Sequence, residues 1–209
     1  MIIIVAATAL VVGGAAYYML RPLEGPAPDG VETHYAGLER GFTGQGFARL
    51  GRPDAPILIE DFSSYACPHC RTFHEEQFEN LLDEIAAGEI QFVMIPIAHI
   101  GSGARNAARG AVCAGEQGKF WEMHDTLFYW QDKYLTSVFD ERRIRLGAEN
   151  LGLDIQAFDD CMASNRPDAV IDEARREFDR RDLTGTPSLF INGQKVRDYR
   201  EIEELDASP

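Results

Sequence analysis

The chain has 209 residues, of which 45% are hydrophobic and 10% aromatic, so it can bury a core and is not disordered as a whole. Its 20 basic and 34 acidic residues give a formal net charge of -14, and no basic run appears, which argues against a nucleic-acid partner. The four cysteines are too few for a miniprotein held together by disulfides. The composition predicts an acidic globular protein of one domain or slightly more.

The first 20 residues are an apolar segment without a charged side chain. As a helix, residues 2–20 would span about 30 Å, which matches a bilayer core. We predict a retained N-terminal membrane anchor, and the alternative is a cleaved signal peptide with Gly14 and Ala16 before the cut. Both place the rest of the chain in the cell envelope, in a periplasmic or extracytoplasmic compartment.

Residues 21–50 are rich in Pro and Gly, which do not sustain a long helix or strand. We predict that this part is a tether, in which a short edge strand at 47–50 is the one regular element. The folded domain is predicted to occupy residues 51–209.

The pattern after residue 50 predicts a strand, a helix and a second strand. Residues 57–62 (ILIEDF) are an apolar run of strand length, and residues 90–97 are another. Between them, apolar residues recur at helical spacing from Pro68 until Gly88, a residue type that commonly ends helices. Such a βαβ unit has parallel strands and a right-handed crossover.

The second half of the chain predicts helices followed by a hairpin. Residues 102–164 contain helical patterns alone, and residues 166–182 form a further amphipathic helix. Two short strands flank Asn192-Gly193, a strong signal for a two-residue turn, and a short helix from Arg200 closes the chain. The predicted fold class is therefore α/β, with a helical insertion between the N-terminal βαβ unit and the C-terminal β-hairpin.

The motif Cys67-Pro68-His69-Cys70 lies where the first strand gives way to the helix. Cys67 falls at the N-cap and Pro68 in the first turn, where its missing N–H is not needed. The unpaired N–H groups of the helix start stabilise a thiolate there, and His69 can add a donor or a positive charge. We therefore predict a low pKa for Cys67 and a more buried Cys70 that acts as the resolving thiol.

Three stretches, GRPDAPILIEDFSSYACPHC, QGKFWEMHDTLF and GTPSLFING, make the chain resemble the DsbA-type branch of the thioredoxin superfamily over about residues 50–199. Members of that branch have a thioredoxin-like fold and make disulfides in envelope proteins. The resemblance implies that Cys67 forms the mixed disulfide with a substrate and that Cys70 resolves it. It implies no cofactor besides the redox-active Cys67–Cys70 disulfide.

Thr186 and Pro187 directly precede the predicted hairpin. An X-Pro bond is the one peptide bond that is cis at appreciable frequency, and in thioredoxin-like proteins this proline is cis and lies beside the disulfide. The resemblance implies that Thr186 and Pro187 bind an extended substrate peptide. The simpler interpretation is a proline that starts an edge strand.

Asp61 lies inside the first predicted strand, six residues before Cys67. A strand covered on both faces buries this carboxylate and raises its pKa. The resemblance implies that Asp61 relays the proton of the buried cysteine. The alternative is a charge at the strand end that reaches water.

Cys113 and Cys161 lie in the predicted insertion, each among apolar residues. They are either small buried hydrophobic residues or a structural disulfide, and we predict the disulfide because the envelope is oxidising. We expect His74 and His124 to be ordinary surface or packing residues.

Two other functional classes compete with an oxidoreductase. Cys67, Cys70 and His74 include ligand types for zinc or copper, but no second ligand pair has a fixed spacing, and we predict no metal site. A peptide-binding or chaperone module would keep its activity after both Cys67 and Cys70 are replaced.

We predict a thiol-disulfide oxidoreductase that donates its disulfide to thiols of exported folding proteins and is re-oxidised by a membrane quinone-linked protein. An isomerase or reductase with the same site is the alternative. Thr186 departs from the Val of the best-known oxidase and also occurs in isomerase and reductase relatives. Dimeric isomerases have an N-terminal dimerisation domain, for which residues 21–50 are too short, so we expect a monomer.

Overall fold

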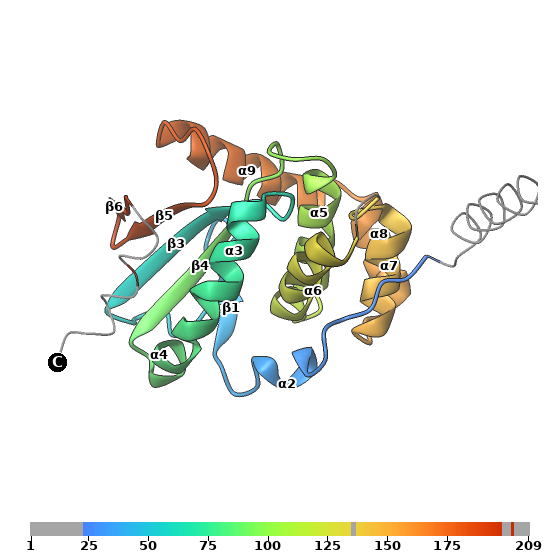
Figure 1. The fold of residues 1–209 in the computed structure, drawn as a ribbon, viewed down its shortest axis with the longest axis horizontal. Helices are drawn as coiled ribbons and strands as arrows, with labels where there is room; N and C mark the ends of the chain where they lie inside the picture. The colour runs from blue at the N-terminus through green and yellow to red at the C-terminus, as the bar shows by residue number, and fades with distance from the viewer. Residues whose placement is uncertain (1–22, 135–136, 198–201, 203–209) are drawn as a thin grey trace, which may run out of the picture.

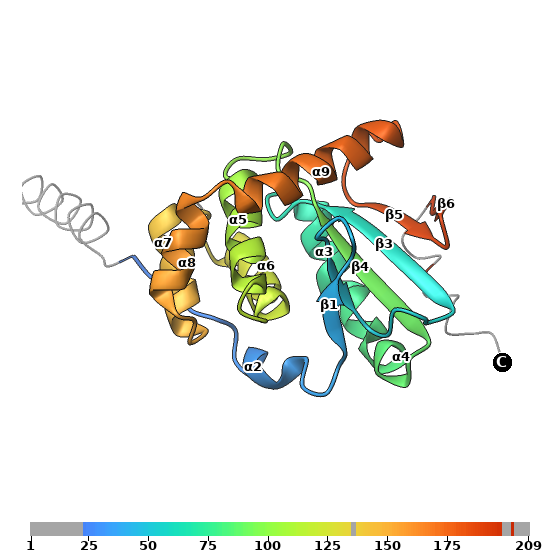
Figure 2. The same cartoon turned by 180° about the vertical axis from the view of Figure 1, so that it is seen from behind.

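A computed structural model of the chain describes residues 23–134, 137–197 and 202. Six strands form one mixed sheet, which Figures 1 and 2 show from its two sides. The strands in chain order are β1 Arg40–Phe42, β2 Ala48–Leu50, β3 Ile57–Ser63, β4 Ile90–Pro96, β5 Ser188–Ile191 and β6 Gln194–Lys195.

The helices fall into four groups along the chain. One turn, α2 Val31–His34, precedes the sheet, and three short helices follow β3: α3 Pro68–Glu76, η1 Phe78–Leu81 and α4 Leu82–Ala87. The insertion contains α5 Ala104–Gly115, α6 Phe120–Lys133, α7 Glu141–Asn150 and α8 Ile155–Ala163. A long helix, α9 Arg166–Arg180, then leads to the last two strands (Figure 1).

The strand order is β1-β2-β4-β3-β5-β6, and the predicted α/β fold class is confirmed. The central pair, β3 and β4, is parallel, as a βαβ unit requires, and all other neighbouring strands are antiparallel. The hairpin between β5 and β6 turns at Asn192 and Gly193, whose φ angles are 48° and 78°. Positive φ at both positions is what a two-residue hairpin turn of this kind needs.

The sheet separates two hydrophobic clusters, so the molecule has three layers. Ile59 and Phe92 pack with α3 and the insertion on one face. Phe62 and Val93, their neighbours of opposite parity, pack against Phe178 of α9 on the other face. Because both faces of β3 are covered, a polar side chain that points from β3 into either hydrophobic cluster is buried.

For residues 23–50, the part of the predicted tether that the structure describes, the prediction is wrong. β1 and β2 pair with each other and extend the sheet beyond β4, and the strand predicted at 47–50 lies inside this edge. Tyr35 is fully buried, and the backbone at Gly25 approaches α7 so closely that a Cβ would lie 2.7 Å from the carbonyl oxygen of Arg143. The elements are three or four residues long, too short for a periodic pattern to reveal.

The predicted helix that starts at Pro68 is interrupted before it reaches Gly88. Gln77, with φ -123° and ψ -52°, leaves the helical region, so α3 ends there and η1 and α4 follow as separate elements. Gly88 ends α4 with a φ of 79°, as predicted for a left-handed helix terminus.

No helix within the described ranges is long and apolar enough to cross a membrane. The predicted anchor at residues 1–20 and most of the short helix predicted from Arg200 lie outside the described residues.

Candidate active site

The two cysteines of the Cys67-Pro68-His69-Cys70 motif lie at the junction of β3 and α3, where the sequence predicts them. Cys67 is the N-cap of α3 with extended backbone angles, φ -99° and ψ 120°, and Pro68 occupies the first turn. The Cys67 carbonyl accepts hydrogen bonds from the amides of Cys70 and Arg71 at 3.1 and 3.2 Å. The side chain of the N-cap residue is therefore placed beside the unpaired amides of the helix start.

The two thiols have different surroundings although they are three positions apart. Both are unbridged; Cys67 is 7% exposed and Cys70 is fully buried. Hydrogen bonding from the Cys70 thiol, and then from Thr186 and the backbone amides of Cys70 and His69, lowers the pKa of Cys67 to about 5. Burial, the neighbouring Cys67 sulfur and the Asp61 carboxylate raise the pKa of Cys70 far above its usual value.

His69 acts in this arrangement through its backbone. Its side chain is exposed, as is that of Pro68, whereas its amide is one of the donors that lower the pKa of Cys67. The sequence analysis assigned the donor role to the amides of the helix start, and the His69 amide is one of them. A further contribution from the His69 side chain stays a prediction.

Asp61 lies beneath the cysteine pair and is 2% exposed. Burial raises its pKa to about 7, and the effect is opposed by the Ser63 hydroxyl, which donates a hydrogen bond to Oδ1 at 2.5 Å. The Cys67 thiolate raises this pKa further. A carboxyl group that titrates near neutral pH next to a buried thiol has the properties of a proton donor and acceptor.

Thr186 and Pro187 meet Cys67 because β5 pairs antiparallel with β3. The pairing of Phe62 with Ser188 places the residues before β5 next to the end of β3. The Thr186-Pro187 bond is cis, and the Cys67 thiol donates a hydrogen bond to the Thr186 carbonyl oxygen at 3.3 Å. The loop therefore contacts the more exposed thiol.

The insertion contributes a residue that the sequence analysis did not identify. The Gln131 side chain, from α6, donates hydrogen bonds to the carbonyl oxygens of Tyr65 and Cys67, at 2.7 and 3.1 Å. Nothing in the spacing of the sequence marks this glutamine, because only the fold of the insertion brings it to the turn. A cavity of about 580 Å³ opens there, lined by Ala66, Ser102, Gly103, Gln131, Ser137, Val138, Phe139 and Asp140.

The other two cysteines are joined to each other. A disulfide links Cys113 of α5 to Cys161 of α8, with their Cα atoms 5.7 Å apart and both side chains at most 1% exposed. This separation is within the usual range for a disulfide.

The alternative of a Cys/His metal site finds no support in the geometry. The described parts of the chain contain two groups of three ligand-type side chains. Within each group the possible ligand atoms lie within 4.8 Å of one another, and neither group includes Cys67 or Cys70. His74, the third predicted ligand of that alternative, lies with His124 and Asp125 instead.

Comparison with known proteins is consistent with this fold and site. A thioredoxin family model matches residues 44–208. The Na(+)/H(+) antiporter NhaA 3 of Salinispora tropica is 31% identical over 160 residues, and the chain spans 76% of its own length but 23% of that relative. Disulfide bond formation protein D of Bacillus subtilis is 23% identical over 169 residues, which cover 75% of this chain and 72% of that protein.

Among solved structures, oxidised BdbD from Bacillus subtilis has a similar fold. The TM-score is 0.70 at 17% sequence identity, and the match covers 90% of this chain and 96% of BdbD. With the family model matching most of the chain, and with the paired cysteines at the start of α3 beside a cis-proline loop, the chain belongs to the thioredoxin family and resembles its DsbA-type members.

Proposed function

We propose that this protein is a thiol-disulfide oxidoreductase that donates the Cys67–Cys70 disulfide to thiols of exported folding proteins. The observation that carries the proposal is the opposite environment of the two sulfurs. Cys67 is the more exposed sulfur and has its pKa lowered to about 5, whereas burial raises the pKa of Cys70. A stable Cys67 thiolate is a good leaving group, which favours the reduced form of the protein and hence oxidation of the client.

The proposed reaction moves two electrons from the client to the cysteine pair. A client thiolate attacks Cys67, the Cys67–Cys70 bond breaks, and Cys70 leaves with the electron pair. A second client thiolate then attacks the client sulfur of the mixed disulfide, and Cys67 leaves as a thiolate. The client gains one disulfide, and Cys67 and Cys70 are left reduced.

Asp61 is proposed to supply the proton that the leaving Cys70 needs. Its pKa of about 7 lets it hold a proton near neutral pH, and it is buried with Cys70 away from bulk water. Thr186 and Pro187 are proposed to bind the extended client peptide next to Cys67, with the cavity beside Gln131 available for client side chains.

We propose that the reaction takes place in the cell envelope and that a membrane quinone-linked protein re-oxidises the pair. Disulfide bond formation protein D, the relative from Bacillus subtilis, has a name that agrees with this proposal. The chain's resemblance to DsbA-type proteins supports the same reaction class. An isomerase or a reductase would use the same residues with a less oxidising pair.

The test is the equilibrium of the Cys67–Cys70 pair with glutathione, together with the thiolate absorbance of reduced Cys67 as a function of pH. We expect an oxidising equilibrium and a Cys67 titration near pH 5, and the reduced Cys67→Ser variant should lack this titration. A reducing equilibrium with a normal Cys67 titration would identify a reductase.

A further inference from the structure

The insertion contacts the active-site turn through one face of α6. His124, Phe128 and Gln131 follow one another at intervals of four and three positions, so their side chains share a face of the helix. All three contact Tyr65, which belongs to the turn between β3 and α3. The turn that leads to Cys67 therefore lies against α6.

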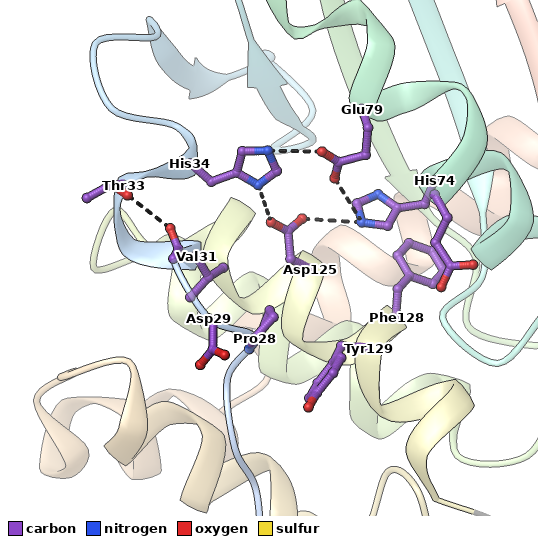
Figure 3. A pocket seen from close by; sticks show the side chains of 12 residues that line it. Pro28, Asp29, Val31, Thr33, His34, His74, Glu79, Asp125, Phe128 and Tyr129 are labelled. Carbon is purple, nitrogen blue, oxygen red and sulfur yellow. Dashed lines mark hydrogen bonds and ion pairs between the residues drawn. The ribbon is translucent and has the colours of Figure 1, made fainter.

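Contacts of Asp125 hold α6 in place. Asp125 lies between His34 of α2 and His74 of α3, as Figure 3 shows, with carboxylate oxygens at 3.1 and 3.4 Å from their ring nitrogens. The Tyr35 hydroxyl donates a hydrogen bond of 2.5 Å to the same carboxylate. The helix that carries Gln131 is therefore anchored to two neighbouring elements.

Gln131 uses both N–H bonds of its side-chain amide on backbone carbonyls of the turn. Its nitrogen donates to the Tyr65 oxygen at 2.7 Å and to the Cys67 oxygen at 3.1 Å. Among the described residues, Gln131 is the one hydrogen-bond donor to the Tyr65 carbonyl. Two acceptors on one side fix the orientation of the amide, because only its nitrogen can donate.

These bonds act on the residue whose sulfur becomes a thiolate. The amides of His69 and Cys70 can reach that sulfur only while Cys67 keeps its extended backbone angles, φ -99° and ψ 120°. Gln131 binds the carbonyl of Cys67 and that of Tyr65, two positions earlier, and so restrains these angles. The partially positive N–H groups of the amide also lie next to Cys67, where they favour a negative charge.

We propose that Gln131 is a positioning residue for the redox pair, which holds the turn so that the Cys67 sulfur faces the amides of the helix start. This inference rests on the proposed function, because it concerns the thiolate of the same cysteine. It makes the insertion part of the redox centre, since a residue of α6 then determines how well a thiolate is stabilised 64 positions earlier in the chain.

Three variants of Gln131 separate a polar effect from packing. The side chain is half-buried and lines the cavity beside the turn, so replacements of similar length have room. Gln131→Leu removes both donors, Gln131→Glu puts a carboxylate in their place, and Gln131→Lys supplies N–H donors with a positive charge. The measurements are the thiolate absorbance of reduced Cys67 as a function of pH and the equilibrium with glutathione.

The three variants should differ in a fixed order. Gln131→Leu should raise the pKa of Cys67 and make the glutathione equilibrium several-fold less oxidising. Gln131→Glu should have a larger effect in the same direction, because a carboxylate repels the thiolate. Gln131→Lys should keep the pKa of Cys67 at or below that of the unchanged chain. If Gln131→Leu does not fold, the other two variants carry the comparison.

Gln117→Leu is the matched control. Gln117 also binds backbone groups through its side-chain amide, but its partner is Asp154 at the start of α8. This control should lose stability in urea unfolding and leave the Cys67 titration and the equilibrium unchanged. Far-ultraviolet circular dichroism establishes that each variant is folded.

Two results would overturn the role of Gln131. One is a Cys67 pKa that is the same in the unchanged chain and in all three variants, and the other is an equal shift in all three. Gln131 would then be a packing residue. An ordinary Cys67 titration in the unchanged chain would instead contradict the proposed function, and the order of the variants would still decide whether Gln131 acts on Cys67.

Discussion

The two cysteine pairs of this chain have the same atoms in opposite settings. Cys67 starts a helix, so backbone amides surround its sulfur, and its partner Cys70 is three residues away. Cys113 and Cys161 are 48 positions apart, lie within two helices of the insertion and are buried among apolar side chains. The comparison shows that a helix start stabilises the thiolate of a cysteine and so favours thiol-disulfide exchange. A buried disulfide between cysteines far apart in the chain instead stabilises the fold.

The largest expected difference between the pairs is in activity. Cys67→Ser should reduce client oxidation to the uncatalysed background, because Cys70 is fully buried and the other two cysteines are joined in a disulfide. Cys70→Ser should also lose client oxidation, because no Cys67–Cys70 disulfide can form. When its Cys67 thiolate attacks a client disulfide and expels one client thiolate, the mixed disulfide should accumulate, which non-reducing electrophoresis detects. The double variant Cys113→Ala/Cys161→Ala should keep its turnover. Loss of turnover in a folded double variant would show that the second pair takes part in exchange.

The second difference is in stability. Removing the disulfide with Cys113→Ala/Cys161→Ala should lower the free energy of unfolding by about 4 kcal/mol, because the unfolded chain regains the freedom of a 48-residue loop. Urea unfolding of the oxidised proteins measures this loss. In the native chain, mild reduction should expose two thiols and unfolding should expose four. Four thiols under mild reduction would contradict a protected second disulfide.

The sequence predicts the setting of the first pair well because its signals are local. The apolar run of β3, the Pro after Cys67 and the turn residues at Asn192-Gly193 are each contained in a few consecutive positions. The parallel β3–β4 pairing and the place of Thr186-Pro187 beside Cys67 follow from these elements and the resemblance.

Features that depend on distant parts of the chain are not predictable in this way. Residues 23–50 contain many Pro and Gly residues, yet they complete the sheet, because the partner strand β4 and the insertion cover them. His34 and Asp125 are 91 positions apart, and no periodicity links them. Of the histidines expected to be ordinary surface or packing residues, His74 proves to be buried against charged groups.

The raised pKa of Asp61, which is buried with Cys70, can be tested through the pH dependence of stability. The folded chain keeps the Asp61 proton up to about pH 7, whereas an unfolded chain loses it near pH 4. The folded state therefore binds more protons between these values, and the free energy of unfolding falls by up to about 4 kcal/mol as the pH rises through this window. Asp61→Asn lacks this loss and should be more stable than the native chain at pH 8 but not at pH 4.

Denaturant unfolding of oxidised protein at several pH values measures the Asp61 effect. Glu60→Gln is the matched control, because Glu60 lies on the opposite face of β3 and pairs with Arg181 near the surface. It should gain no stability at pH 8. Asp61→Asn should also slow release of the mixed disulfide by Cys70, because Asp61 can no longer exchange a proton with that thiol. A stability difference that does not change with pH would contradict a raised Asp61 pKa.

The smallest expected effect concerns the hydroxyl of Thr186. This buried hydroxyl has no hydrogen-bond partner in the described structure, and a hydrogen bond from it to the Cys67 thiolate would help to lower the pKa of Cys67. Thr186→Val removes the hydroxyl and keeps the carbonyl that accepts from Cys67. The reduced form should lose roughly 1 kcal/mol of stabilisation, the net contribution of one hydrogen bond, so the glutathione equilibrium should become several-fold less oxidising.

Thr72→Val, on the exposed side of α3, should leave the equilibrium unchanged. An unaltered equilibrium in Thr186→Val would mean that the backbone amides and Cys70 alone stabilise the thiolate, and the contrast between the two cysteine pairs would then rest entirely on the helix start.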